Sequence, residues 1–143
     1  MALSAFDADV RALADALRRR GWRLATAESC TGGMIAAACT ALAGSSDWFE
    51  CGFVTYSNAA KSDMLGVPPA LIQTHGAVSQ AVALAMASAA LQRAGVECSV
   101  AVTGIAGPGG ATPGKPVGTV WLAVAHVAAD GAMVAQAERL QLA

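Results

Sequence analysis

The sequence has little charge and few aromatic side chains. Only 13% of its 143 residues are charged and 5% are aromatic, whereas 55% are hydrophobic. A typical globular domain is ~25% charged. Small aliphatic side chains must therefore build most of the core, which favours helices packed closely on a sheet. Because a small monomer needs more surface charge to stay in solution, the low charge also predicts self-association, and we expect a homo-oligomer.

The few charges form no pattern typical of a nucleic-acid or membrane partner. The net charge is −1, and the one basic cluster, Arg18–Arg20, ends a predicted helix before Gly21. Cations at that position complement the helix dipole. Residues 64–92 carry no charge, but their two prolines and several polar residues argue against a membrane span. We expect neither nucleic acid nor a membrane as a partner.

Cysteine and histidine likewise show no pattern that indicates a metal site. The four cysteines form no CxxC pair, and His75 and His126 lack the spacing of metal ligands. We therefore expect no metal and no cofactor. The opening stretch MALSAFDADV has no signal-peptide pattern, so a cytoplasmic setting with reduced thiols is the expectation. The cysteines are Cys30, Cys39, Cys51 and Cys98.

The order of apolar patterns predicts one α/β domain over residues 1–143. Strand and helix alternate through the first two-thirds of the chain, and strand follows strand at the end. This order predicts a three-layer α/β/α sandwich with a mixed sheet, parallel in its early strands and antiparallel in its C-terminal strands. Strands are predicted at 22–29, 49–56, 98–105, 119–127 and 133–142. Helices are predicted at 5–20, 32–42, 57–65 and 79–93, with a helical turn at 68–72.

Polar clusters follow three of the predicted strands, at residues 28–33, 56–61 and 103–110. In sheets with parallel strands, ligands bind beyond the carboxyl ends of those strands. We therefore expect the three clusters to converge in one cleft.

Ser29, in the stretch TAESCTGG, is the candidate nucleophile. It precedes a predicted helix whose first amides, around Gly32 and Gly33, lack partners within the helix and can bind an oxyanion or a phosphate. The alternative is that Ser29 or Thr31 is a plain helix cap. Cys30 is the rival nucleophile, but no histidine partner is apparent, so we interpret it as a small buried side chain.

Lys61 is the candidate base, since a serine nucleophile needs one. It is one of two lysines among nine basic residues, and a desolvated lysine can lose its proton whereas arginine cannot. The alternative is an ordinary solvated lysine. Tyr56, the single tyrosine, either packs on apolar surface or uses its hydroxyl to tune Lys61 or hold substrate. Glu28 either orients Lys61 or a substrate amide, or simply sits at a favourable helix start.

Thr103 lies at the end of the third predicted strand and, like Ser29, has a hydroxyl and is followed by glycines, here in a loop rich in glycine and proline. The stretch GGATPGK satisfies the spacing of a phosphate-binding P-loop, but Pro116 occupies the Ser/Thr position and a strand follows, so we reject that interpretation. The loop either contacts a nucleotide or merely turns the chain. Our candidate substrate contacts are Glu28, Thr31, Gly32, Gly33, Gly104, Gly107, Gly109 and Gly110.

Five motifs in this order closely resemble one family: TAESCTGG, GFVTYSNAAK, HGAVS, VTGIAGPGG and PVGTVW. They are similar to the carboxy-terminal domain of the competence/damage-inducible protein CinA, a family that includes stand-alone nicotinamide-nucleotide amidohydrolases. The resemblance covers Trp22 to Val127, which is most of the chain.

The resemblance implies hydrolysis of nicotinamide mononucleotide to nicotinate mononucleotide and ammonia, in pyridine-nucleotide salvage. By motif matching, the family's serine nucleophile falls on Ser29 and its lysine on Lys61, while its assisting tyrosine and threonine fall on Tyr56 and Thr103. Neutral Lys61 would take the Ser29 proton, and the amides near Gly32 and Gly33, with the Thr103 hydroxyl, would stabilise the oxyanion. The loop Gly107–Gly110 is our candidate for the phosphate or ribose.

The sequence departs from the family pattern at its end. Longer relatives carry an additional amino-terminal domain that resembles molybdopterin-binding proteins. Relatives also continue past the last strand into a segment with a glycine–arginine motif and a closing helix, whereas this sequence stops at RLQLA. Either the chain is truncated or a neighbouring subunit covers the exposed sheet face. The alternative function is therefore a non-catalytic nucleotide-binding or assembly module of the same fold.

Overall fold

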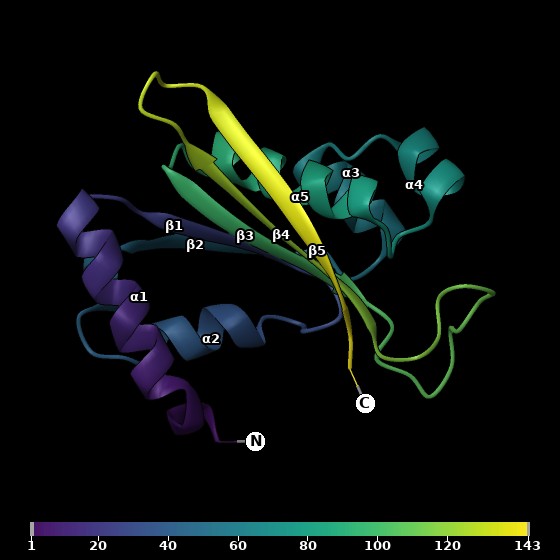
Figure 1. Ribbon diagram of the computed structural model, residues 1–143, viewed down its shortest axis with the longest axis horizontal. Coiled ribbons are helices and arrows are strands. Elements are labelled where there is room, and N and C mark those ends of the chain that lie inside the picture. Colours follow the sequence, from purple (N-terminus) through teal and green to yellow (C-terminus); the bar gives the residue numbers. More distant parts are fainter. Residues whose placement is uncertain (1, 143) are drawn as a thin grey trace.

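A mixed sheet of five strands organises the computed structural model, which describes residues 2–142 (Figure 1). The strand order is β2-β1-β3-β4-β5, with β1 parallel to both β2 and β3. β4 runs antiparallel to β3 and β5. The predicted mixed sheet is confirmed. The strands are β1 (Leu24–Glu28), β2 (Phe49–Val54), β3 (Cys98–Gly104), β4 (Thr119–Val127) and β5 (Met133–Gln141).

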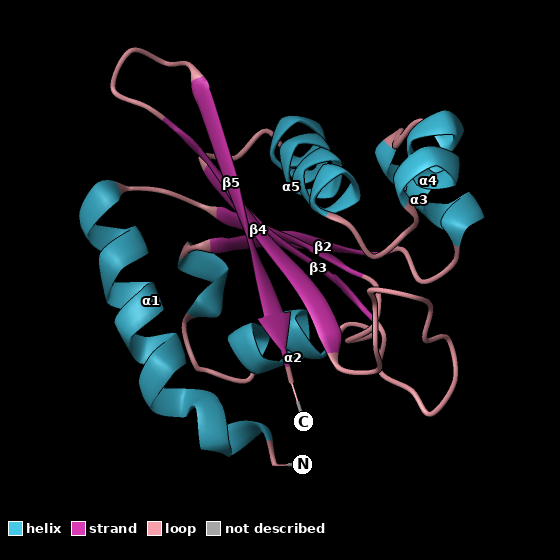
Figure 2. Ribbon diagram, turned by 45° about the vertical axis from the view of Figure 1, so that its right-hand side comes forward, coloured by secondary structure: helices cyan, strands magenta, loops and turns pink. Residues whose placement is uncertain are grey.

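Helices cover both faces of the sheet, which confirms the predicted three-layer architecture. Figure 2 shows α1 and α2 on one face and α5, with α3 and α4 beside it, on the other. The helices are α1 (Asp7–Arg20), α2 (Met34–Thr40), α3 (Asn58–Leu65), α4 (Pro69–His75) and α5 (Gln80–Ala94). Two 3₁₀ turns, Leu3–Phe6 and Ser45–Asp47, precede α1 and β2.

Small side chains let α5 approach the sheet closely. Ala27, Ala101, Ala123 and Ala125 have no exposed surface and belong to the same core cluster as Met86 of α5. The alternation of strand residues places these alanines on one face, so the helix packs on a nearly flat surface of methyl groups. This packing explains how a chain with so few aromatic residues builds a dense core.

The opposite face is covered only in part. α1 contributes Val10, Ala14 and Leu17 to a second core cluster that contains the fully buried Trp48. On the same face of β4 and β5, Val124 and Val134 remain 37% and 43% exposed. The expectation of self-association stays a prediction, because a single chain does not test it.

Serine caps fix the starts of α3 and α5. The Ser57 and Ser79 side chains accept hydrogen bonds from the amides of Ala60 and Val82, as capping serines do. α2 is shorter than predicted, because Gly32 and Gly33 take positive φ values of 60° and 102° and cannot join the helix. None of the helices within residues 2–142 combines the length and hydrophobicity needed to cross a bilayer.

Candidate active site

The three polar clusters line one cavity beyond the carboxyl ends of β1 and β3. We call it the Ser29 cavity, and its volume is about 280 Å³. Eight of the predicted site residues line it, whereas Glu28, Thr31, Gly32 and Gly33 do not. The eight are Ser29, Tyr56, Lys61, Thr103, Gly104, Gly107, Gly109 and Gly110.

The amine of Lys61 and the hydroxyl of Ser29 are in direct contact. Lys61 Nζ donates to Ser29 Oγ at 3.1 Å, and the two side chains are 1% and 7% exposed. Ser29 directly follows β1, and its amide donates to the carbonyl of Val102 in β3 at 3.0 Å. Lys61 lies in the first turn of α3, whose start is fixed by the Ser57 cap. Two separate strand ends therefore set the distance between amine and hydroxyl.

Burial lowers the pKa of Lys61 below the 10.5 of an ordinary lysine amine, whereas a thiolate at Cys30 would raise it. Apart from Ser29, the partners of Nζ are the backbone carbonyls of Tyr56 at 3.1 Å and Ser57 at 3.5 Å. Within residues 2–142, no carboxylate lies within salt-bridge distance of Lys61. Burial without a carboxylate partner therefore shifts the amine toward its neutral form, which is the form that can accept a proton.

Tyr56 contributes its backbone carbonyl to this arrangement. That oxygen accepts hydrogen bonds from Lys61 Nζ at 3.1 Å and from Ser29 Oγ at 3.3 Å, while the residue as a whole is 72% exposed. The Tyr56 hydroxyl makes no hydrogen bond to any residue in the range 2–142. The carbonyl, and not the hydroxyl, makes the contact with Lys61, and the alternative that the hydroxyl holds substrate stays a prediction.

Thr103 holds the opposite wall of the cavity. Its hydroxyl donates to the carbonyl of Ala77 at 2.9 Å, and the side chain is 1% exposed. This bond fixes the segment that contributes Ala77 and Val78 to the lining. Because the hydroxyl proton is already engaged, the structure gives Thr103 a positioning contact in place of the expected oxyanion contact. The motif HGAVS contained the signal for Ala77 and Val78, but their apolar side chains gave no chemical reason to select them.

Glu28, the last residue of β1, binds the first amides of α2. Its carboxylate accepts hydrogen bonds from the Thr31 hydroxyl at 2.6 Å and from the amides of Ile35 and Ala36 at 2.8 and 3.0 Å. The side chain is 1% exposed, so the interpretation of Glu28 as a helix-start carboxylate holds, and within residues 2–142 it makes no hydrogen bond to Lys61. A contact between Glu28 and substrate stays a prediction. The prediction that Thr31 caps this helix is wrong, because its hydroxyl donates to Glu28.

The expected oxyanion donors at Gly32 and Gly33 are also displaced from the cavity. The Gly32 amide donates to the carbonyl of Ser29 at 3.0 Å, which closes a turn. The amide of Cys30, by contrast, donates to no oxygen atom within residues 2–142, and Cys30 lines the cavity. Burial raises the pKa of its thiol, which keeps the sulfur protonated. The sequence did not indicate the Cys30 amide, because every residue except proline has a backbone amide and the side-chain pattern does not distinguish this one.

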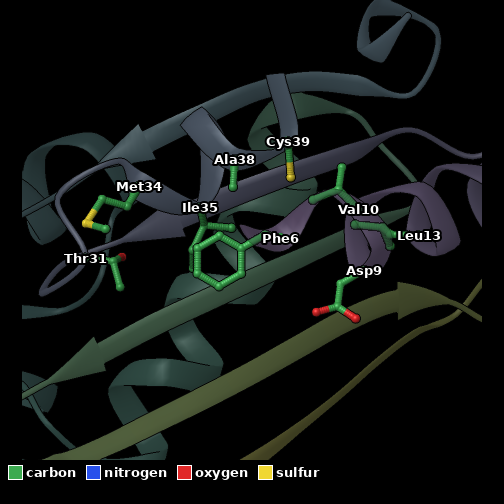
Figure 3. Close-up of a pocket in the computed structure, with 9 residues that line it drawn as sticks. All are labelled: Phe6, Asp9, Val10, Leu13, Thr31, Met34, Ile35, Ala38 and Cys39. Carbon is green, nitrogen blue, oxygen red and sulfur yellow. The ribbon is translucent and has the colours of Figure 1, made fainter. Parts of the chain in front are cut away.

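A larger apolar cavity lies between α1 and α2. Its volume is about 390 Å³, and Figure 3 shows Phe6, Val10 and Leu13 opposite Ile35 and Cys39. Asp9 is the one charged residue in its lining, which has no lysine or histidine to serve as a base. Across residues 2–142, no group of three or more His, Cys, Asp or Glu side chains gathers to hold a metal ion. The Ser29 cavity is therefore the candidate active site.

Comparison with known proteins places this chain in one family. The model of the CinA C-terminal domain matches residues 7–141. The chain belongs to the CinA C-terminal domain family.

Two kinds of relatives match this chain. A CinA-like protein of Geobacter sp. (strain M21) is 63% identical over 113 residues, which are 79% of this chain and 27% of that protein. A protein named nicotinamide-nucleotide amidohydrolase PncC, from Enterobacter agglomerans, is 54% identical over 110 residues, which are 77% of this chain and 67% of that protein. The match thus spans about a quarter of the CinA-like relatives but two-thirds of PncC.

Solved structures show the same fold. The competence damage-inducible protein A (ComA) of Klebsiella pneumoniae superposes with a TM-score of 0.86 at 42% identity, over 94% of this chain and 80% of that one. The competence/damage inducible protein CihA of Agrobacterium tumefaciens gives a TM-score of 0.81 at 49% identity, over 90% and 76% of the two chains.

The capping function of Glu28 predicts a large cost for a small change. In Glu28→Gln, an NH₂ group replaces one acceptor oxygen and meets a helix amide, so we expect the free energy of unfolding to fall by roughly 1–3 kcal/mol. Urea denaturation measures this change. Glu50→Gln is the control, because it breaks only an exposed ion pair with Arg23 and is expected to cost less than about 1 kcal/mol. Equal costs in the two variants would rule out the capping account.

Proposed function

We propose that this chain is an amidohydrolase that cleaves a carboxamide C–N bond with Ser29 as the nucleophile and Lys61 as its base. The contact of 3.1 Å between Nζ and Oγ carries this proposal. A buried amine without a carboxylate partner costs stability when charged, and such perturbed groups in a cavity are typical of catalytic sites.

The chemistry proceeds in two stages. Neutral Lys61 accepts the Ser29 proton as Oγ attacks the carboxamide carbon, and the resulting ammonium returns a proton to the nitrogen that leaves as ammonia. Water then attacks the acyl ester with Lys61 again as base, which releases the carboxylate product and restores the Ser29 hydroxyl. The Tyr56 carbonyl holds the amine in reach of Oγ throughout, since it accepts from both groups.

The amide of Cys30 is the proposed oxyanion donor. It directly follows the nucleophile in the chain, lines the cavity and donates to no oxygen within residues 2–142. The amides of Ile35 and Ala36 at the start of α2 are unsuitable for this purpose, because Glu28 occupies them. One preorganised donor of this kind contributes roughly 10²–10³-fold to turnover.

Nicotinamide mononucleotide is the proposed substrate, with nicotinate mononucleotide and ammonia as products. The amidohydrolase name of the Enterobacter agglomerans relative supports this choice. The cavity also suits it, since Gly107, Gly109 and Gly110 let a ribose approach the backbone beside the reacting carboxamide. The reaction as proposed needs no cofactor.

Removal of either reacting group should abolish turnover. We expect Ser29→Ala and Lys61→Met each to reduce ammonia release from nicotinamide mononucleotide by about 10³-fold or more, with the fold intact. Released ammonia and the near-ultraviolet circular dichroism spectrum are the two measurements. Ser88→Ala, outside the Ser29 cavity, is the matched control.

Cys30→Ala separates the rival nucleophile from the proposed one. It should retain most of the turnover, because the backbone amide remains and only the thiol is removed. Near-normal ammonia release by Ser29→Ala would refute the assigned chemistry. Binding of the mononucleotide by the unaltered chain without any product would instead support a nucleotide-binding module.

The pH dependence follows from the lowered pKa of Lys61. Neutral amine accumulates as pH rises through that pKa, so kcat/KM should climb with pH and level off below the 10.5 of an ordinary lysine. The free energy of unfolding should also rise between the folded pKa and 10.5, because only the unfolded chain binds the proton there. Initial rates of ammonia release from neutral to alkaline pH test this, and a climb centred on 10.5 would contradict it.

A further inference from the structure

A second cavity lies beside the Ser29 cavity, and two cations line it. We call it the basic cavity; its volume is about 280 Å³. The lining includes Lys115 from the glycine-rich loop and Arg139 from β5, with no aspartate or glutamate. Such convergence is unexpected from a chain whose net charge is −1 and which has only two lysines. The lining residues are His75, Ser79, Gln80, Ala81, Gly114, Lys115, Trp121 and Arg139.

Hydrogen bonds to backbone carbonyls fix both cations in place. Lys115 Nζ donates to the carbonyl of His75 at 2.6 Å, and Arg139 Nη2 donates to the carbonyl of Gly114 at 3.0 Å. Neither has a carboxylate within salt-bridge distance among residues 2–142. No carboxylate therefore neutralises either charge. Each group also has unused N–H donors, since an ammonium has three N–H groups and a guanidinium has five. The cavity is preorganised for an anion.

The two cavities share a wall. Ala77 lines the Ser29 cavity and Ser79 lines the basic cavity, and residues two apart in sequence lie at most about 7 Å apart between Cα atoms. Thr103 and Trp121 likewise line different cavities, although they pair directly across β3 and β4. A pair of this kind has its Cβ atoms about 4.5–5.5 Å apart. The two cavities are therefore adjacent, with the segment around Ala77 and Ser79 and the strand pair β3–β4 between them.

We propose that the basic cavity binds the phosphate monoester of the substrate while the carboxamide lies against Ser29. This inference rests on the proposed function. Arg139 and Lys115 supply charge-assisted hydrogen bonds to the phosphate oxygens. Gln80 and Ala81 begin the long helix α5, so the positive end of its dipole adds to the attraction. The glycines of the loop then face the ribose between the two ends of the ligand.

A pair of substrates tests the assignment by kinetics. Nicotinamide riboside has the carboxamide and ribose of the mononucleotide but no phosphate. In Arg139→Gln and Lys115→Gln, we expect KM for the mononucleotide to rise roughly tenfold or more, with kcat preserved. KM for the riboside should rise much less, because for that substrate each variant removes only one of the two hydrogen bonds that tie the loop. Arg19→Gln, which removes an exposed cation of α1, is the control. Unchanged KM for the mononucleotide in both cavity variants would overturn the assignment.

A binding measurement keeps this test independent of turnover. Calorimetry with Ser29→Ala protein and nicotinate mononucleotide should give a Kd that Arg139→Gln weakens roughly tenfold or more, while Arg139→Lys restores part of it. If the chain with Ser29 intact releases no ammonia but Arg139→Gln weakens binding, the proposed function is refuted and the phosphate site is supported. If the chain with Ser29 intact releases ammonia but Arg139→Gln leaves the Kd unchanged, the phosphate site is refuted and the proposed function is supported. Inorganic phosphate that binds without competing with the mononucleotide would also overturn the proposal.

Discussion

The contact between a buried amine and a hydroxyl is the interaction on which the site depends. Lys61 is 1% exposed, and within residues 2–142 its Nζ hydrogen-bonds only to Ser29 and to two backbone carbonyls. No carboxylate therefore offsets the cost of its charge. Burial shifts the amine of Lys61 toward its neutral form. The parallel pairing of β1 with β2 helps to place its Nζ beside Ser29, since Ser29 directly follows β1 and the helix α3 that carries Lys61 begins shortly after β2.

Several polar groups near the cavity serve to build it. Glu28 binds the first amides of α2, and the Thr103 hydroxyl holds the carbonyl of Ala77. These contacts fix the turn that carries Ser29 and the wall that separates the Ser29 cavity from the basic cavity. The glycine-rich loop is tied at two points, through Lys115 to the end of α4 and through Arg139 to β5. Preorganisation of this kind is what an active site needs before substrate arrives.

The sequence predicted the layers of the fold, the mixed sheet and the convergence of its strand ends, because these follow from alternation and from short-range caps such as Ser57 and Ser79. It did not predict the Tyr56 carbonyl or the Cys30 amide, since backbone atoms are the same at every position. Nor did it reveal the basic cavity, because Lys115 and Arg139 approach each other only through the pairing of β4 with β5. Glu28 was ambiguous, as a carboxylate before a helix has several partners within reach.

Titration of the two lysine side chains tests the central claim most directly. The chain has only Lys61 and Lys115, so a lysine-selective ¹³C and ¹⁵N NMR spectrum contains two side-chain signals, and Lys61→Met assigns them. The account predicts that the Lys61 signal titrates below the 10.5 of an ordinary lysine and shifts when Ser29 is replaced. A Lys61 signal that titrates near 10.5 would show that this amine carries its proton at neutral pH and would contradict the account.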